Sequence, residues 1–359
     1  MTNMPGITLL ASGRLDERAS AFPQAVQLPD GDILCSYSVG GGAEVTGGTD
    51  WSRSQDNGLN WTHAGTLAPH DAANRMANFL KLSLAADGKA VYAYGAEISD
   101  DVSSQFGQRD TFALFCKSID AGKTWSTPQR VPFPVDCPLE VSFAAVPLRS
   151  GRLLAPAATL PDKDRLGEQV FVAISDDDGQ SWTEHATVFQ DPNAKEGFFE
   201  HKFSQLSNGQ ILATAWNVQL GDYRDLPNCY ALSHDEGLTW SSPRSTGIAG
   251  QTMSTLSLGG NRLLVLYNRR YGQQGIVMNL VTIDDDSWTL HYEGLMYDAK
   301  FQHQRDADAT FGIDEFDDFA FGFPTAIQLH DDSILATHWS VENNRCGIRW
   351  TKLRVDWAS

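Results

Sequence analysis

The chain has 359 residues, including 10 Trp, 18 Phe and 31 Gly, and a formal net charge of −18 at pH 7. This charge argues against nucleic acid and anionic membranes as partners, because it offers neither phosphate neutralisation nor attraction to an anionic surface. No apolar run approaches the roughly 20 residues that span a bilayer, and the aromatic and glycine content is typical of short strands with tight turns.

The N-terminal segment, MTNMPGITLLASGRLDE, lacks the basic start and apolar core of a secretory signal. The five cysteines are odd in number and contain no Cys-x-x-Cys pair, which favours reduced thiols. We therefore expect a cytoplasmic protein, or a secreted one if a leader has been removed. No zinc, nucleotide or serine-hydrolase motif occurs, so we expect neither a metal nor a cofactor.

A pattern of apolar strand, polar turn and apolar strand recurs six times along the chain. Clear copies are FPQAVQLPDGDILCSY from Phe22, SFAAVPLRSGRLLAPA from Ser142, EHKFSQLSNGQILATAW from Glu200 and FPTAIQLHDDSILATHW from Phe323; looser copies begin at Phe79 and Gln251. The Asp/Asn-Gly type of turn supplies the positive φ of a tight hairpin, and the flanking residues alternate as half-buried strands do.

In four copies a third strand and a second motif, Ser-x-Asp-x-Gly-x-(Thr/Ser/Asn)-Trp, follow the hairpin. These motifs are SQDNGLNW from Ser54, SIDAGKTW from Ser118, SDDDGQSW from Ser175 and SHDEGLTW from Ser233, with a degenerate version in TIDDDSWT from Thr282. The sixth copy ends at its third strand, GIRWTKLRVDW, and the N-terminal GITLLASG reads like the missing fourth. We expect residues 7 to 12 to pair alongside 346 to 354 and to close a ring of four-stranded units.

The three consecutive aspartates of SDDDGQSW suggest a cation site at first, but a catalytic or metal cluster is not normally copied four times. The sequence predicts a structural turn, in which the Asp177 side chain accepts hydrogen bonds from turn amides. Gly179 is expected in the left-handed conformation and Trp182 against the sheet. The neighbouring Asp176 and Asp178 are expected only to face solvent.

These four elements resemble the Asp-box, or BNR, repeats of the sialidase superfamily, and the six hairpins extend the resemblance over essentially the whole chain. The resemblance implies an all-β fold: one domain, residues 1–359, forming a six-bladed β-propeller of four-stranded antiparallel blades. It does not fix the function, because such repeats are structural and occur in glycosidases, lyases and non-enzymatic propellers.

The strand order of such a propeller predicts which face carries the ligand site. The hairpin turns and the Asp motifs share one face, so the connections between second and third strands and between successive blades share the other. These connections are long and irregular, as at 38–51, 95–112, 217–228, 268–275 and 297–322. Binding groups concentrate on such loops, and the channel mouth on this face is the expected site.

Position by position, the resemblance to sialidases holds for one catalytic residue and fails for two others. The glutamate that activates the nucleophile in that family lies six residues before a strand leucine, and Glu200 precedes Leu206 by that interval. The first clamp arginine of the family corresponds to Ala21, and the nucleophilic tyrosine corresponds to Phe323, which has no ionisable oxygen.

The remaining candidates come from the same loops and strand ends. Glu44 and Asp50 are the carboxylates where the family has its acid/base aspartate, and His303 lies in a loop that could cover the channel as a proton carrier. Guanidinium groups could grip an anionic sugar, and indole or phenol rings could stack on a sugar face. The corresponding candidates are Arg18, Arg75, Arg224, Arg269, Arg270, Trp216, Tyr267 and Trp339.

Together these residues predict a carbohydrate-active enzyme. We expect an exo-acting glycoside hydrolase that removes a terminal, acidic sugar from a glycan or oligosaccharide without a tyrosine intermediate. A polysaccharide lyase acting on a uronate-containing glycan and a non-catalytic glycan-binding propeller are the alternatives. A pair of carboxyl groups at the channel mouth would favour the hydrolase. A His-Tyr-Arg cluster would favour the lyase, and an aromatic, uncharged mouth would favour a protein that only binds glycans.

Overall fold

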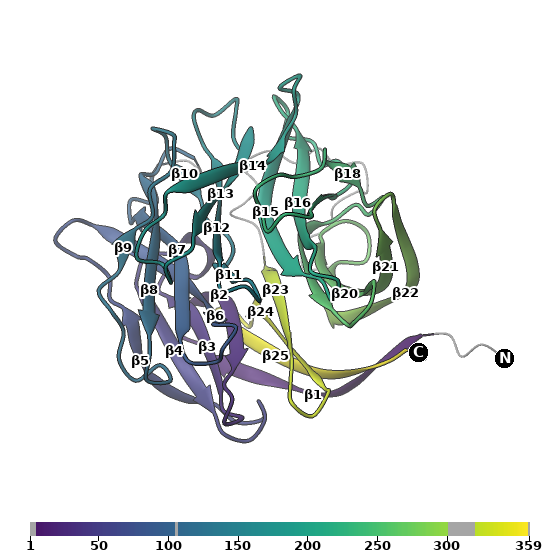
Figure 1. The fold of residues 1–359 in the computed structure, drawn as a ribbon. Helices are drawn as coiled ribbons and strands as arrows, with labels where there is room; N and C mark the ends of the chain where they lie inside the picture. Colours follow the sequence, from purple (N-terminus) through teal and green to yellow (C-terminus); the bar gives the residue numbers. More distant parts are fainter. Residues whose placement is uncertain (1–4, 105–106, 301–319, 358–359) are drawn as a thin grey trace.

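The computed structural model describes residues 5–104, 107–300 and 320–357. They form six antiparallel sheets that surround a central axis as the blades of a propeller (Figure 1). The predicted all-β, six-bladed fold is confirmed, and the 3-10 turn η1 (Gly42–Glu44) is the one helical element among the described residues. No helix in this part of the chain is long and apolar enough to cross a membrane.

Each blade runs outward from the axis in chain order, except that β1 forms the outer strand of the sixth blade. Blades one and two contain β2 (Ser20–Gln27), β3 (Ile33–Val39), β4 (Thr49–Ser54), β5 (Thr62–Ala68), β6 (Met76–Leu84), β7 (Val91–Ser99), β8 (Thr111–Ser118) and β9 (Gln129–Arg130). Blades three and four contain β10 (Leu139–Glu140), β11 (Val146–Pro147), β12 (Leu153–Thr159), β13 (Gln169–Ser175), β14 (Glu184–Gln190), β15 (Glu196–Gln205), β16 (Ile211–Gln219), β17 (Cys229–Ser233) and β18 (Arg244–Ser245). Blades five and six contain β19 (Gln251–Ser257), β20 (Arg262–Arg269), β21 (Gly275–Asp284), β22 (Ser287–Asp298), β23 (Phe321–Gln328), β24 (Ile334–Glu342), β25 (Arg345–Asp356) and β1 (Gly6–Asp16).

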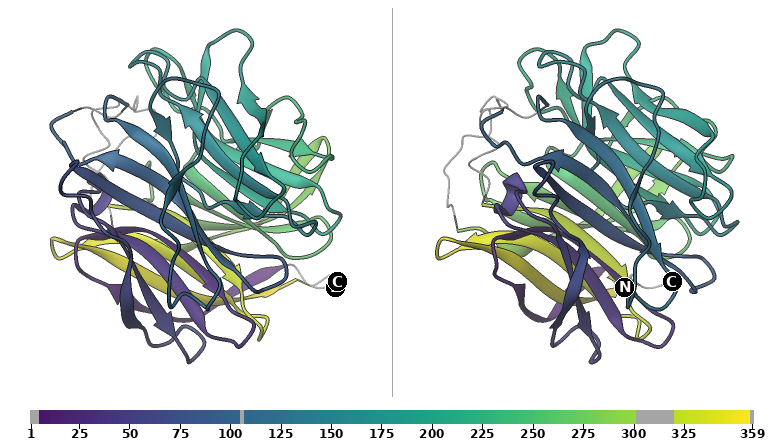
Figure 2. Two further views of the ribbon diagram at one scale, coloured as in Figure 1. Left: turned by 60° about the vertical axis from the view of Figure 1, so that its left-hand side comes forward. Right: turned by 90° about the vertical axis from the view of Figure 1, so that its left-hand side faces the viewer.

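The N-terminal strand completes the last blade, as the sequence predicted. β1 pairs antiparallel with β25 from Gly6↔Asp356 to Asp16↔Ile348, and the two strands run side by side in both views of Figure 2. The ring is therefore closed by hydrogen bonds between the two ends of the chain. This closure leaves the sixth blade without an unpaired edge on its β25 side.

The Ser-x-Asp-x-Gly turns have the predicted structural role. Asp177 accepts hydrogen bonds from the Ser181 amide at 2.8 Å and the Ser181 hydroxyl at 2.6 Å. Gly179 has φ +77°, and Trp182 packs in the core between blades two and three. These hydrogen bonds to the carboxylate hold the pKa of Asp177 down at about 2.

The two aspartates that flank Asp177, Asp176 and Asp178, were expected only to face solvent, but both form ion pairs. Asp178 forms an ion pair with Lys117 of blade two, and Asp176 pairs with Arg152 at 2.8 Å. Both carboxylates stay partly exposed, so they are not buried cation ligands. Asp178 nevertheless links two neighbouring blades rather than facing solvent alone.

The hydrophobic core lies between the faces of neighbouring blades, because alternate residues of each strand point toward one adjacent blade. The rings of Phe189 in blade three and Phe198 in blade four stack with centroids 5.4 Å apart. Equivalent clusters fill the spaces between the other blades. The five cysteines carry free thiols.

The innermost strands of four blades contain a β-bulge near the channel mouth. The bulges interrupt the register of β2, β15, β19 and β23, and each contains a residue with positive φ: Phe22, Glu200, Thr252 and Phe323. Such a backbone is costly for residues other than glycine. Bulges re-aim side chains, and here they occur at equivalent points around one channel.

Candidate active site

We name one position in each blade by its place relative to the hairpin turn. The ring position lies six residues before the residue whose amide closes that turn, and the six are Phe22, Phe79, Ser142, Glu200, Thr252 and Phe323. All except Thr252 line one pocket of about 400 Å³. The pocket also takes residues from the loops after β3, β7 and β20, so it opens on the face that the strand order predicted.

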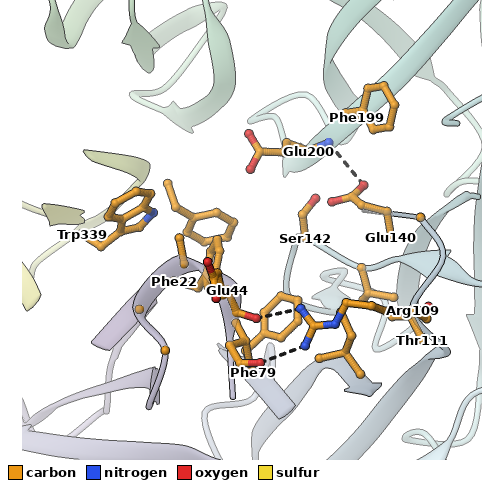
Figure 3. Close-up of a pocket in the computed structure, with 18 of the residues that line it drawn as sticks. Phe22, Glu44, Phe79, Arg109, Thr111, Glu140, Ser142, Phe199, Glu200 and Trp339 are labelled. Carbon is orange, nitrogen blue, oxygen red and sulfur yellow. Dashed lines mark hydrogen bonds between the residues drawn. The ribbon is translucent and has the colours of Figure 1, made fainter. Parts of the chain in front are cut away.

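One side of the pocket is an aromatic wall made by blades six, one and two. The Phe22 ring centroid lies 5.2 Å from that of Phe79 and 5.3 Å from that of Phe323, while Trp339 is 6.5 Å away. Figure 3 shows Phe22 and Trp339 on the same side of the pocket, with Phe79 below them. Phenylalanine rings offer no hydrogen bonds, so this wall suits the C–H face of a ligand.

The opposite side of the pocket carries two partly buried carboxylates, Glu200 and Glu140. The Glu200 amide donates a hydrogen bond to Glu140 Oε2 at 3.3 Å, and the Glu200 side chain projects away from this contact into the pocket (Figure 3). Burial raises the pKa of Glu200 to about 7, although the positive charges of Lys202 and Arg270 oppose the shift. Glu200 can therefore carry a proton near neutral pH.

Glu140 is the site residue that the sequence reasoning missed. Burial raises its pKa, with Lys202 and Lys81 acting in the opposite direction. It lies at the end of β10, two residues before the ring position Ser142. The ring-position register, applied to the segment CPLEVSF, would have drawn attention to it.

Five of the sequence candidates line the pocket: Glu200, Glu44, Arg270, Trp216 and Trp339. Glu44 is an exposed rim residue in η1, whose backbone oxygen accepts a hydrogen bond from Arg109 at 2.8 Å. Arg270 is buried and donates to Phe321 O at 2.7 Å and to Gln251. Trp216 is held through its indole nitrogen by Asp225 at 2.7 Å.

Asp50 and Arg18 do not line the pocket, because they pair with each other. Arg18 Nη1 lies 2.9 Å from Asp50 Oδ2, and the other contacts of Asp50 are His63 at 2.9 Å and Thr66 at 2.8 Å. These partners occupy both carboxylate oxygens of Asp50. Catalysis by Asp50 and substrate binding by Arg18 stay predictions, with no support from their positions.

The remaining candidates lie on other parts of the loops and strands. Arg75 pairs with Asp100 at 3.0 Å, Arg269 pairs with Glu293 at 2.8 Å, and Arg224 bonds to Gln219. Tyr267 is buried in the core between blades four and five. None of these four lines the pocket. His303 lies outside the described residues.

Two further histidines near the channel, His201 and His338, are fully buried. Burial lowers the pKa of each to about 3. Both imidazoles are therefore neutral across the physiological range, and neither is a proton carrier near pH 7. In the part of the chain that the structure describes, no group of three or more His, Cys, Asp or Glu residues could hold a metal ion.

Fold and pocket together define a six-bladed propeller with a carboxylate-bearing pocket at one end of its axis. Residues 51–334 match the BNR repeat-like domain family, and the chain belongs to this family. The predicted relationship to the sialidase-like propellers is thereby confirmed. No curated protein sequence matches the chain.

Several solved structures share the fold at low sequence identity. A protein of unknown function from Dyadobacter fermentans DSM 18053 is 19% identical, with a TM-score of 0.75 over 98% of this chain and 100% of its own. A point mutant of the NanB sialidase from Streptococcus pneumoniae is 13% identical, with a TM-score of 0.65 over 96% of this chain and 70% of its own. An α-L-arabinanase from Penicillium chrysogenum is 17% identical, with a TM-score of 0.63 over 96% and 98%. At these identities the likeness establishes the fold alone.

Proposed function

We propose that this protein is an exo-acting glycoside hydrolase that removes a terminal sugar from a glycan or oligosaccharide. The observation that carries the proposal is the pair of partly buried carboxylates, Glu200 and Glu140, in one pocket. Most glycosidases need two carboxyl groups, one to protonate the leaving oxygen and one to act as base or nucleophile. Sialidases and arabinanases among the similar folds are consistent with this class.

Glu200 is the proposed general acid. With its pKa raised to about 7, it holds a proton at neutral pH and can transfer it to the glycosidic oxygen as the bond to the anomeric carbon breaks. A water molecule supplies the oxygen that bonds to that carbon. Glu140 is the proposed second carboxyl, which takes the water proton directly or first attacks the carbon itself, and the anomeric configuration of the released sugar distinguishes these two routes.

The exo mode follows from the shape of the site. The pocket has a volume of about 400 Å³, at the lower end of the range for ligand sites. Next to it, the rings of Phe79 and Phe323 lie against the buried lysines Lys81 and Lys202. We propose that these side chains close the channel beyond the pocket, so that the terminal residue of a sugar chain is the one that reaches the carboxylates.

The charged groups of the pocket favour an uncharged sugar over the acidic sugar expected from the sequence. Three glutamates, Glu44, Glu140 and Glu200, line the pocket. Its two lining guanidinium groups are already engaged: Arg270 by Gln251 and Phe321 O, and Arg109 by three backbone oxygens. An anionic sugar would therefore meet like charge without an open guanidinium clamp.

The two alternatives have less support. A lyase of the kind considered needs His or Tyr to abstract a proton, and none of the described residues that line the pocket is either. A glycan-binding propeller is compatible with the aromatic wall. It gives no reason for two carboxylates to be partly buried at the cost of raised pKa values.

The test is a panel of nitrophenyl glycosides, neutral and acidic in matched pairs, with product absorbance as the readout. We expect turnover of a neutral glycoside, and a kcat lower by about 10²- to 10⁴-fold in Glu200→Gln and Glu140→Gln. Glu184→Gln, an exposed residue on β14 outside the pocket, is the matched control. Full activity in Glu200→Gln would remove that residue from the mechanism, and glycan binding without turnover of any glycoside would favour the binding propeller.

A further inference from the structure

The channel below the pocket contains two lysines, Lys81 and Lys202, which are 0% and 1% exposed. They occupy equivalent places, each two residues after the ring position of its blade, on β6 and β15. An ammonium group loses several kcal/mol of hydration when it is buried, so its retention needs compensating contacts. Neither lysine forms a salt bridge within 4.0 Å among the described residues, which raises the question of what the two groups do.

Both ammonium groups contact the same short segment of blade three. Lys81 Nζ donates to Val141 O at 2.9 Å, and Lys202 Nζ donates to Ser142 O at 2.7 Å. The two lysines reach this segment from opposite sides, because blade three stands between blades two and four. Two adjacent carbonyl groups are therefore held by two neighbouring blades.

This segment is also where the innermost strand of blade three is interrupted. β10 pairs with β12 through Leu139 and Glu140, and β11 pairs with it through Val146 and Pro147. Residues 141 to 145, between these described strands, form no ladder with β12. The lysine contacts thus take the place of ladder hydrogen bonds directly after Glu140.

Aromatic rings and carboxylates complete the surroundings of the two lysines. Lys202 Nζ lies 3.4 Å from the centre of the Phe323 ring, and Lys81 Nζ lies 3.9 Å from that of Phe79. In their protonated forms both lysines act on Glu140 and Glu200, although burial lowers the pKa of Lys81 well below its usual value and that of Lys202 to about 7. Cation–π contacts of this kind stabilise a desolvated ammonium group.

We propose that Lys81 and Lys202 are positioning residues that clamp the segment after β10 from two sides, and so hold Glu140 beside Glu200 at the channel mouth. The lysines touch neither solvent nor the pocket interior, so they act through the carboxylates and not on the substrate. The proposal rests on the proposed function only for its kinetic consequences, because the clamp itself is a matter of position and charge.

Removing one arm of the clamp has two separable effects. The segment loses a hydrogen bond next to Glu140, and misplacement of a catalytic group by about 1 Å can cost about 10²-fold in rate. Glu200 also loses a nearby positive charge. The charged groups acting on it are Lys202, Arg270, Glu140 and Lys81, so removal of Lys202 favours the protonated form of Glu200 and raises its pKa.

The kinetic experiment compares Lys202→Met and Lys81→Met with Lys352→Met. Lys352 is the control, because it is also buried and donates to a backbone oxygen across a blade boundary, at Asn57 O, but lies outside the pocket. It differs from the two pocket lysines in an ion pair with Asp331 at 3.1 Å. We expect kcat to fall about 10- to 100-fold in both pocket variants with a smaller change in KM. The basic limb of the pH profile moves upward in Lys202→Met and stays in place in Lys352→Met.

A second measurement does not depend on activity. In protein labelled with ¹³C at the glutamate carboxyl carbon, the resonance absent from Glu200→Gln identifies Glu200, and its titration reports the pKa directly. An upward shift in Lys202→Met supports the clamp even if no glycoside is hydrolysed, in which case the proposed function alone fails. Lys202→Gln, which keeps a donor without the charge, separates hydrogen bonding from charge.

Three results would overturn the clamp. In the first, Lys202→Met and Lys81→Met have the same Glu200 titration curve and the same kcat as Lys352→Met. Another is a titration curve of Glu140 and Glu200 that moves equally in all three variants, which would indicate a general loosening of the fold. The third is failure of every Lys81 and Lys202 variant to fold, because the lysines would then serve the fold itself.

Discussion

The pH dependence of Glu200 offers the most direct check on the site. Its pKa is raised from 4.5 to about 7 by burial. As a general acid it is half protonated at pH 7 and about 1% protonated at pH 9, so kcat/KM should fall about 50-fold between these pH values. With an ordinary pKa of 4.5, less than about 1% would carry the proton at pH 7.

The same shift has a consequence for stability with a definite sign. The folded state keeps the Glu200 proton up to about pH 7, whereas the unfolded chain loses it near 4.5, so stability falls as the pH rises through this window. The shift of roughly 2.5 units corresponds to about 3 kcal/mol. Lys202 does not contribute to the pH dependence of stability in this range. Its pKa is lowered to about 7, so its own effect on stability begins only above pH 7.

The assays are kcat/KM from pH 5 to 9 and urea unfolding from pH 4 to 8, each for the native protein and Glu200→Gln. We expect the residual activity of the variant to lose the basic limb near pH 7. We also expect the difference in unfolding free energy between the two proteins to change by about 3 kcal/mol across the window. A basic limb that survives in Glu200→Gln, or equal pH slopes of unfolding, would refute the assignment of the raised pKa to this residue.

Three further predictions concern the scaffold. Deletion of residues 1–13 removes most of β1 and should lower the melting temperature far more than loss of a free tail, so an unchanged melt would contradict the closure seen in the β1–β25 pairing. Gly179→Ala places a Cβ 2.2 Å from Phe115 at φ +77°, whereas the Cβ of Gly209→Ala meets nothing within 4 Å at φ +93°. Urea unfolding should therefore show a loss of unfolding free energy that is about 1 to 3 kcal/mol larger for Gly179→Ala than for Gly209→Ala. Equal losses in the two variants would count against the packing argument. Asp177→Ala should lower the melting temperature while turnover per folded molecule stays constant, and a folded but inactive variant would restore the catalytic interpretation of SDDDGQSW.

The site itself was only partly within reach of the sequence. The register that identified Glu200 works because a bulge at a fixed interval before the hairpin re-aims one side chain in each of four blades, as it does at Phe22 and Phe323. Glu140 escaped this reasoning because it lies two residues before the ring position of its blade, Ser142, on a strand that ends at Glu140. The sequence also could not show which of the adjacent residues Arg269 and Arg270 points toward the pocket.

By itself the sequence determined the architecture, because strand alternation, hairpin turns and Ser-x-Asp-x-Gly turns depend on contacts within a few residues of each other. The six copies and the missing last strand then required closure by the N-terminus. Only the tertiary structure decided the partners of charged groups, since Arg18 and Asp50 pair with each other at 2.9 Å while Lys81 and Lys202 turn inward. A charged side chain is fixed by whichever opposite charge, carbonyl or ring the neighbouring blade brings within a few ångströms, and those neighbours are set by the packing of blades far apart in the chain.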